Sequence, residues 1–262
     1  MDRADASGPA PAFRYDGSGV HRSYDSGRAL TDESRRVWSA EIREHLGGAP
    51  GRRVVDLGAG TGRFSGLLRD LLAARVYAVD PSADMLGQAV AKPELAGVAL
   101  VRAAAEALPL RGATVDAVFV YLAFHHFADR DAALAECARV LVPGGRLMIC
   151  SPTRETLDSF LWMRFFPTAD RIDRARMPSR DAIIGAGRRG GLELERQWTV
   201  ERGFTLGPTE YVERVGRRTF SALVMISAAA FDAGMRELRR ACAARDPGER
   251  IGEDIDVLLF RR

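Results

Sequence analysis

Cysteine, lysine and long apolar runs are scarce in this chain, and each scarcity excludes a class of protein. The three cysteines, Cys137, Cys150 and Cys242, are far apart and odd in number, so they indicate neither a disulfide framework nor a metal site. No apolar run approaches membrane-spanning length, and no signal peptide opens the chain. We therefore expect a cytoplasmic protein without membrane segments or bound metal.

Concentrated positive charge is also absent. The net charge is +3 in 262 residues, and almost all of the 38 basic residues are arginines spread thinly along the chain. A nucleic-acid-binding protein usually gathers such residues into a basic stripe. Nucleic acid is therefore not an expected partner, and the apolar content of 47% is typical of an ordinary globular protein.

One stretch is rich in glycine. The sequence Val-Val-Asp-Leu-Gly-Ala-Gly-Thr-Gly-Arg-Phe over residues 54–64 reads as a buried strand that runs into three alternating glycines, and Asp80 closes the next apolar run. A dinucleotide fingerprint would need glycine where Arg63 stands. A phosphate-binding P-loop would need a lysine, and Lys92, the only one in the chain, lies elsewhere. The loop still predicts a close approach of backbone to ligand, with Asp80 placed for ribose hydroxyls.

Strand and helix patterns alternate from residue 53 to residue 150, which predicts a parallel, doubly wound sheet in an α/β domain. We expect a single domain over residues 31–262 with a core at 50–151, after a flexible segment at 1–30 that closes over the site. The expected strands are 53–57, 75–79, 99–102, 115–122, 146–150, 192–200 and 254–260, and the main expected helices are 32–46, 82–90, 129–141, 179–187, 209–217 and 227–244.

Several polar side chains fall at or just after predicted strand ends. They are Asp56, Asp80, Glu106 and the segment 121–126. Parallel strands all end at one edge of the sheet, where ligands of such folds bind. These residues are therefore expected to meet in one crevice.

Together these motifs resemble class I S-adenosylmethionine-dependent methyltransferases, in particular the ubiquinone/menaquinone C-methyltransferase-like enzymes and their natural-product relatives. The resemblance covers residues 50–151 and includes the glycine loop, Asp80-Pro81-Ser82, Leu108-Pro109, Phe124-His125-His126-Phe127 and the turn at 143–145. It implies a Rossmann-like sheet of order 3-2-1-4-5-7-6 with helical lid insertions over the carboxyl edge. It also implies a cofactor site formed by Asp56, Gly58, Ala59, Gly60, Gly62, Asp80, Pro81, Met85, Ala105, Glu106 and Tyr121.

Three parts of this resemblance leave alternatives open. Relatives often carry Asp at the position of Ala104, where it accepts a bond from adenine; here either Glu106 or a backbone carbonyl would replace it. His125 and His126 lie beside the expected sulfonium, where one of them orients or deprotonates the acceptor, or where both are architectural. In the N-terminal segment, Arg28 is a candidate for the cofactor carboxylate and Tyr24 for the methyl group, unless the segment is only a mobile tail.

The acceptor pocket is predicted from topology. An antiparallel last strand would make the connections at about 152–178 and 203–245 pass over the crevice. Their aromatic residues are then pocket candidates, namely Phe160, Trp162, Phe165 and Tyr211, although an aromatic stripe at helical spacing is more often core.

The predicted activity is methyl transfer from S-adenosylmethionine to a small organic acceptor, with S-adenosylhomocysteine as product, by a monomer or homodimer. One alternative is an RNA or protein methyltransferase, but the chain lacks a basic stripe and an Asn/Asp-Pro-Pro-aromatic motif at residues 121–124. The other is a non-catalytic, cofactor-binding partner protein.

Overall fold

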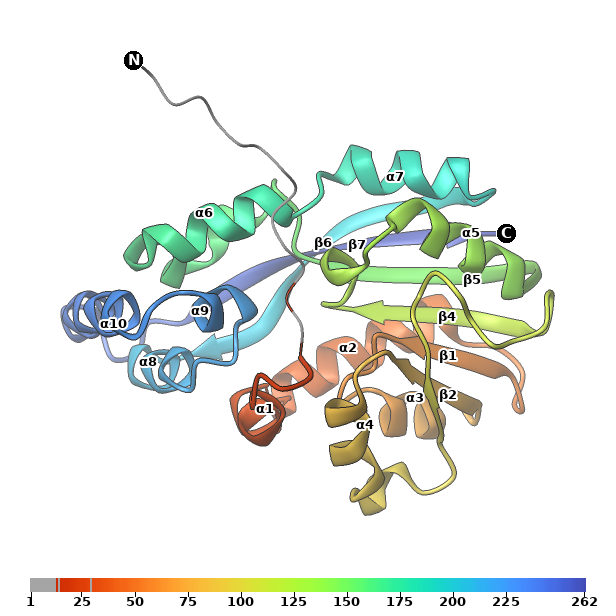
Figure 1. The fold of residues 1–262 in the computed structure, drawn as a ribbon, viewed down its shortest axis with the longest axis horizontal. Coiled ribbons are helices and arrows are strands. Elements are labelled where there is room, and N and C mark those ends of the chain that lie inside the picture. Colours follow the sequence, from red (N-terminus) through yellow and green to blue (C-terminus); the bar gives the residue numbers. More distant parts are fainter. Residues whose placement is uncertain (1–12, 14, 29) are drawn as a thin grey trace.

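A seven-stranded sheet forms the centre of the computed structural model, which describes residues 13, 15–28 and 30–262. The strand order is β3-β2-β1-β4-β5-β7-β6, as predicted, and helices flank the sheet (Figure 1). The strands are β1 (Arg53–Leu57), β2 (Arg75–Asp80), β3 (Ala99–Arg102), β4 (Val115–Tyr121), β5 (Leu141–Ser151), β6 (Glu193–Leu206) and β7 (Ile251–Arg261). The α-helices are α1 (His21–Arg28), α2 (Asp32–Leu46), α3 (Ser65–Leu72), α4 (Ala83–Val90), α5 (Arg130–Val140), α6 (Pro167–Arg176), α7 (Arg180–Arg189), α8 (Pro208–Gly216), α9 (Ser221–Met225) and α10 (Ala228–Ala243).

Strand direction brings the predicted site residues to one edge. The strands from β3 to β5 pair in parallel, whereas β7 is antiparallel to both β5 and β6. The carboxyl ends of β1, β2, β4 and β5 therefore lie side by side. The prediction of an antiparallel last strand is confirmed.

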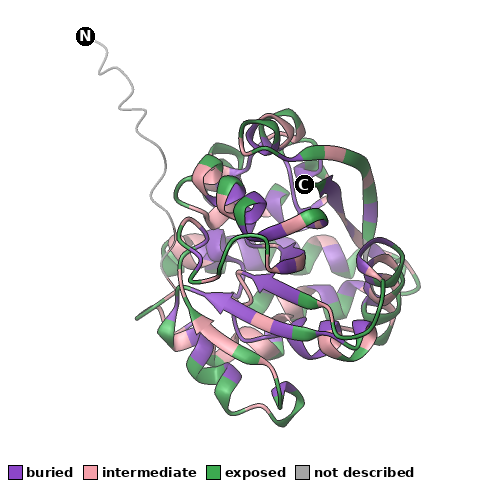
Figure 2. Ribbon diagram, turned by 90° about the vertical axis from the view of Figure 1, so that its right-hand side faces the viewer, coloured by how far each residue is buried: buried purple, intermediate pink, exposed green. Residues whose placement is uncertain are grey.

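Both faces of the sheet are covered, because successive side chains of a strand point to opposite sides. In β4, Phe119 and Tyr121 pack in the cluster that includes Trp38 of α2 and Leu68 of α3. Val118, from the other face, packs in the cluster formed with α5 and α7. Figure 2 shows the buried centre of the sheet between these layers.

Several strands extend further than their sequence patterns predicted. β5 begins at Leu141 and includes the predicted turn at 143–145, and β6 continues to Leu206 instead of ending at residue 200. The reason is pairing: Leu206 still faces Ile251 of β7 after a register shift. The second lid insertion thus begins after residue 206, four residues later than its expected start.

Residues 1–12, 14 and 29 of the predicted flexible segment lie outside the described residues. The described part forms turns and then α1, which the sequence did not predict. α1 contacts α4 and α8, so this segment lies across the carboxyl edge of the sheet.

The two insertions predicted as a lid form 3₁₀ turns and helices. The first contains the 3₁₀ turns Leu157–Ser159 and Leu161–Phe165 and helix α6, and the second contains α8, α9 and α10. Figure 1 shows α6, α8, α9 and α10 gathered at one end of the sheet. In the part of the chain that the structure describes, no helix combines the length and apolar character needed to cross a bilayer.

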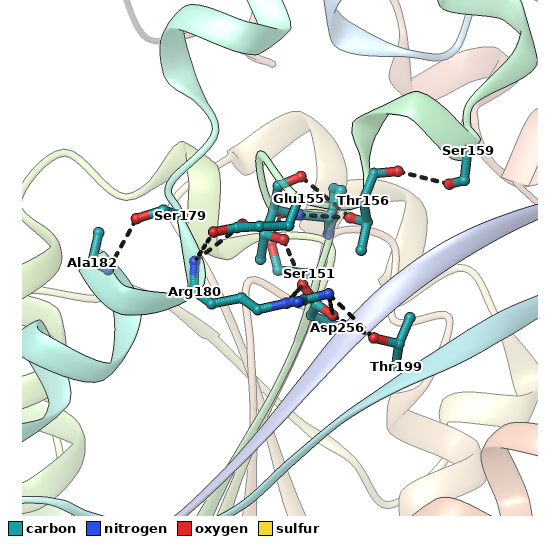
Figure 3. A network of polar contacts seen from close by, with 11 residues as sticks. Ser151, Glu155, Thr156, Ser159, Ser179, Arg180, Ala182, Thr199 and Asp256 are labelled. Carbon is teal, nitrogen blue, oxygen red and sulfur yellow. Dashed lines mark hydrogen bonds and ion pairs between the residues drawn. The ribbon is translucent and has the colours of Figure 1, made fainter.

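A buried polar network ties the first lid insertion to the sheet (Figure 3). Asp256 of β7 is fully buried and accepts hydrogen bonds from Arg180 at 2.7 and 2.9 Å, from Thr153 at 2.5 Å and from Thr199 at 2.8 Å. Glu155 in turn accepts from the backbone amide of Arg180 at 3.2 Å. The network joins β6, β7 and the two ends of residues 152–180, and so fixes where this lid begins and returns.

Candidate active site

A cavity of about 560 Å³ opens over the carboxyl ends of β1, β2 and β4. Its size falls within the range of typical small-molecule sites. The predicted cofactor residues that line it are Gly58, Gly60, Asp80, Pro81, Met85, Ala105, Glu106 and Tyr121. Phe13, Tyr15 and Tyr24 from the N-terminal segment line the same cavity.

The glycine loop brings bare backbone to this cavity. Gly58 and Gly60 have φ of 73° and 57°, values that favour glycine. A Cβ on Gly58 would lie 2.3 Å from the Cβ of Ala123, so the chain segments after β1 and β4 approach closely there. The backbone amides of Gly58 and Ala59 donate to the carbonyl of Val79, which fixes the loop against β2.

Asp80 is held at the end of β2 by two backbone amides. Its Oδ2 accepts from Gly60 at 2.8 Å and its Oδ1 accepts from Ser82 at 2.9 Å. Burial raises the pKa of this carboxyl above its usual value, and the two amides oppose that rise. Each carboxylate oxygen can accept a further hydrogen bond from a ligand hydroxyl.

Three predicted cofactor residues lie near the cavity but do not line it. Asp56 is buried and accepts from the Ser65 hydroxyl at 2.6 Å, and burial raises its pKa to about 6. A Cβ on Gly62 would meet the side chain of Leu95, so Gly62 permits packing behind the loop. Ala59 does not line the cavity either. The geometry gives these three residues a supporting position.

The carboxylate of Glu106 already accepts hydrogen bonds from within the protein. Its Oε1 accepts from the backbone amides of Ala128 at 2.8 Å and Asp129 at 3.1 Å, and so fixes the chain before α5. The backbone of residues 103–105 lines the cavity beside it. Of the two alternatives left open for adenine recognition, this arrangement favours a backbone group.

The N-terminal segment is attached to this cavity by two acidic residues that the sequence analysis did not identify. Asp16 accepts from the Ser82 hydroxyl at 2.5 Å and from the amide of Asp84 at 3.2 Å. Asp25 accepts from the Thr61 hydroxyl at 2.5 Å and forms an ion pair with Lys92 at 2.7 Å. In the sequence, only Lys92 could have drawn attention to these attachments, because it is the single lysine of an arginine-rich chain.

A second, smaller chamber of about 40 Å³ adjoins the cavity. Tyr15, Tyr24, Leu122 and His126 line both compartments. Leu122 has φ of 54°, an uncommon value for a residue other than glycine, and its amide donates to the carbonyl of Cys150 at 2.8 Å. Strained backbone of this kind concentrates at functional sites, but its position is invisible in a sequence.

His126 lines both compartments and His125 lines the small chamber, and both rings are neutral. Burial lowers the pKa of His126 most, and together with the charges of Arg176, Arg28 and Arg130 it brings this pKa to about 3. Burial and the neighbouring His126 also lower the pKa of His125 well below its usual value. Nε2 of His126 lies 3.1 Å from the Tyr15 hydroxyl, so the segment predicted as a possible mobile tail contacts a candidate catalytic residue.

The predicted acceptor residues divide into two groups. Phe160 and Trp162 line the small chamber, as does Arg28, which was predicted to bind the cofactor carboxylate. Phe165 and Tyr211 lie outside the lining of both compartments. The Tyr211 hydroxyl accepts from the amide of Trp162 at 3.0 Å, so this buried ring supports the chamber wall from behind.

Arg176 and Asp173 of α6 also line the small chamber and were missed. Their side chains form an ion pair at 2.5 Å and are 9% and 6% exposed. The sequence offered several arginines near this segment, and nothing in their spacing distinguished Arg176, which faces inward, from its exposed neighbours.

Comparison with known proteins gives the family context of this geometry. A family model described as "Methyltransferase domain" matches residues 55–149. A malonyl-[acyl-carrier protein] O-methyltransferase of Methylococcus capsulatus is 43% identical over 136 residues, which are 51% of this chain and 49% of the relative. A demethylmenaquinone methyltransferase of Mycolicibacterium paratuberculosis is 34% identical over 172 residues, 63% of this chain and 72% of the relative. The chain thus spans only about half the length of the first of these relatives.

Among solved structures, a protein from Anabaena variabilis described as a methyltransferase of an antibiotic biosynthesis pathway has a TM-score of 0.67. It is 22% identical, and the match covers 86% of this chain and 99% of that protein. At this identity the similarity establishes the fold alone. It agrees with the sheet order.

Proposed function

The chain belongs to the family of class I S-adenosylmethionine-dependent methyltransferases, and on that premise we propose that it methylates a small organic acceptor. The products are the methylated acceptor and S-adenosylhomocysteine. The observation that carries the proposal is the pair of adjoining compartments, which share Tyr15, Tyr24, Leu122 and His126 at their junction. A cofactor in the larger compartment and an acceptor at the junction, with one group in the smaller compartment, would meet there.

The larger cavity fits the cofactor in three respects. Its volume suits a ligand of this class. The Asp80 carboxylate is positioned by two amides and keeps acceptor capacity for ribose hydroxyls. The buried Tyr121 hydroxyl has no hydrogen-bond partner among the described residues, and a polar group of the cofactor would satisfy it.

We assign the cofactor contacts residue by residue from this fit. Gly58 and Gly60 would face the methionine part, Asp80 the ribose, and Pro81 with Met85 the adenine side. The backbone at Ala105 would border the adenine edge. When bound, the cofactor supplies an electrophilic methyl group on a sulfonium centre.

The protein's own contribution is positioning and exclusion of water. Methyl transfer requires an in-line approach, and correct orientation alone can contribute several kcal/mol, on the order of 7 or more in favourable cases. Tyr15 and Tyr24 cover the junction, while the neutral His125 and His126 hold their rings there. We propose that these histidines and Tyr24 orient the acceptor and that neither histidine carries a positive charge.

Two alternative functions have less support. An RNA or protein substrate would need an extended basic surface, whereas the proposed acceptor chamber is small and enclosed by the N-terminal segment. One relative is named for a malonyl group on a carrier protein and the other for a menaquinone. A non-catalytic partner protein would bind cofactor without turnover. We also propose a cytoplasmic location and a monomer or homodimer.

A ligand panel tests the proposal. S-adenosylmethionine and S-adenosylhomocysteine should each raise the melting temperature, and at 100 times the dissociation constant they should add about 2.7 kcal/mol of stability. NAD should not, because Arg63 stands at the third glycine position of a dinucleotide fingerprint. Stabilisation by NAD alone would refute the proposed function.

A second step separates the alternatives. The protein is incubated with methyl-labelled S-adenosylmethionine in three parallel reactions. Each reaction contains one possible source of acceptor, namely a small-metabolite ultrafiltrate, total RNA or total protein. Label in the ultrafiltrate supports the proposal. Label in RNA or protein supports the macromolecular alternative, and cofactor binding without any label supports the non-catalytic one.

A further inference from the structure

One buried guanidinium in the small chamber has hydrogen-bonding capacity that the protein does not use. The side chain of Arg176 is 9% exposed and lines the chamber. Its Nε donates to Oδ1 of Asp173 at 2.7 Å, and its Nη2 donates to the Ser221 hydroxyl at 2.5 Å and forms an ion pair with the same Asp173 oxygen at 2.5 Å. Its Nη1 is buried without a hydrogen-bond partner among the described residues. Burying a charged donor unpaired is costly, so an acceptor group on a ligand would be strongly favoured here.

The charges around this atom favour an anion. Among the described residues that line the chamber, Arg28 and Arg176 are cations and Asp173 is the one carboxylate. His125 and His126 are neutral, because burial and the nearby arginines lower the pKa of each. Arg130 adds a further cation behind the wall, where its Nη2 donates to the Arg176 carbonyl at 2.6 Å. The chamber therefore has an excess of positive charge in a poorly solvated place, where electrostatic attraction is strong.

The rest of the chamber wall is apolar. It includes Leu157, Phe160, Trp162, Met163 and Phe220. The guanidinium of Arg28 lies 4.1 Å from the centroid of the Phe220 ring, so one arginine is itself stacked on this wall. An apolar lining with a few fixed polar groups is the usual composition of a site for a small organic ligand.

We propose that the acceptor carries a carboxylate and that Arg176 binds this group through Nη1 in the small chamber, with the remainder of the acceptor at the junction with the larger cavity. The inference rests on the proposed function, because it assigns the substrate class of the same site. A carboxylate oxygen can accept a charge-assisted hydrogen bond from Nη1, and the group brings a single negative charge. A phosphate monoester would bring up to two charges and three oxygens. The chamber offers fewer hydrogen-bond donors than such a group would need.

Simple carboxylates test this inference in protein loaded with S-adenosylhomocysteine. Benzoate and propionate are compared by calorimetry or ligand-observed NMR with their neutral counterparts benzamide and propionamide, and inorganic phosphate serves as the other anion. Each carboxylate should bind roughly 10-fold or more tightly than its amide, because a charge-assisted bond to a buried donor is lost in the amide. Equal binding of acid and amide, or tighter binding of phosphate, would overturn the proposal.

Variants locate the binding group. Arg176→Met would leave Asp173 buried and unpaired, so the informative variant is the pair Asp173→Asn with Arg176→Met, which removes both charges together. It should lose the preference for benzoate over benzamide while keeping its affinity for S-adenosylhomocysteine. Arg176→Lys should keep only part of the preference, because lysine lacks the planar fork.

Arg171→Met is the matched control, since Arg171 lies on the same helix but is exposed. It should bind benzoate as the wild-type protein does. An unchanged benzoate preference in the double variant would overturn the assignment to Arg176. Failure of the wild-type protein to bind S-adenosylhomocysteine at all would refute the proposed function itself and this inference with it, whereas normal binding of S-adenosylhomocysteine without a carboxylate preference refutes only the inference.

Discussion

The hydroxyl of Tyr15 lies 3.1 Å from Nε2 of His126, which joins the N-terminal segment to the chain after β4 across 111 residues of sequence. The two rings also meet edge to face, with centroids 5.3 Å apart. Tyr15 and His126 both line the large cavity and the small chamber. This contact therefore closes the site at the place where the two compartments meet.

Replacing Tyr15 with Phe should loosen the N-terminal segment without unfolding the domain. The change removes one hydrogen bond, worth about 0.5–1.5 kcal/mol, and leaves the ring in place. Hydrogen exchange in peptides that cover residues 15–28 should become roughly 2- to 10-fold faster. Tyr77→Phe on β2, which alters a tyrosine outside both compartments, should leave that exchange unchanged. Equal exchange in Tyr15→Phe and the wild-type protein would show that the contact does not hold the segment.

The neutral state of His126 predicts how stability changes with pH. Its pKa is about 3 in the folded protein and about 6.5 when unfolded, so below pH 6.5 the unfolded chain takes up a proton that the folded protein does not. The free energy of unfolding should therefore fall as the solution is acidified, with no effect above neutral pH. Between pH 7.5 and pH 5 this histidine alone should contribute a loss of about 2 kcal/mol.

Urea unfolding of the wild-type protein and His126→Gln at these two pH values measures that contribution. The variant loses its hydrogen bond to Tyr15 at both pH values, so the titration is reported by the change in the free energy of unfolding between pH 7.5 and pH 5. This change should be smaller in the variant than in the wild-type protein. Equal changes in the two proteins would mean that His126 is protonated in the folded protein as readily as in the unfolded chain.

The network around Asp256 should be a main source of stability for the first lid insertion. Asp256→Asn weakens the buried ion pair with Arg180, whose side chain is still 31% exposed. Removing one partner of a buried pair costs about 3–5 kcal/mol, and the partial exposure of Arg180 favours the lower end. Asp131→Asn breaks the exposed pair with Arg189 and should cost far less, because solvent screens that pair. Similar losses in the two variants, measured by denaturant unfolding, would contradict this account.

Sequence patterns were sufficient for the sheet and for residues at strand ends. Asp80 and the glycines could be identified because the chain enters the loop from a strand, and strand direction alone determines where Asp80 lies. The end of β6 was placed too early because its pairing with β7 past residue 200 depends on a partner about 50 residues away. The local alternation of apolar residues does not predict such a pairing.

The acceptor side could be predicted only in part. Phe160 and Tyr211 are both apolar positions near the predicted pocket, yet Phe160 lines the chamber and Tyr211 supports it from behind. Helical spacing does not indicate which of two layers a side chain enters. Arg176 and the attachments of Asp16 and Asp25 were missed for a related reason, since each depends on a tertiary contact rather than on a local pattern.

Calorimetric titration of Asp80→Ala with S-adenosylhomocysteine tests the central claim most directly. Loss of a charge-assisted pair of ribose hydrogen bonds should weaken binding by about 1.5–3 kcal/mol, or roughly 10- to 150-fold. Asp80→Asn, which keeps an oxygen for only one of the amides of Gly60 and Ser82, should lie between Asp80→Ala and the wild-type protein, and Asp70→Ala at an exposed position should bind normally. Unchanged affinity in folded Asp80→Ala would contradict the assignment of this cavity to the cofactor.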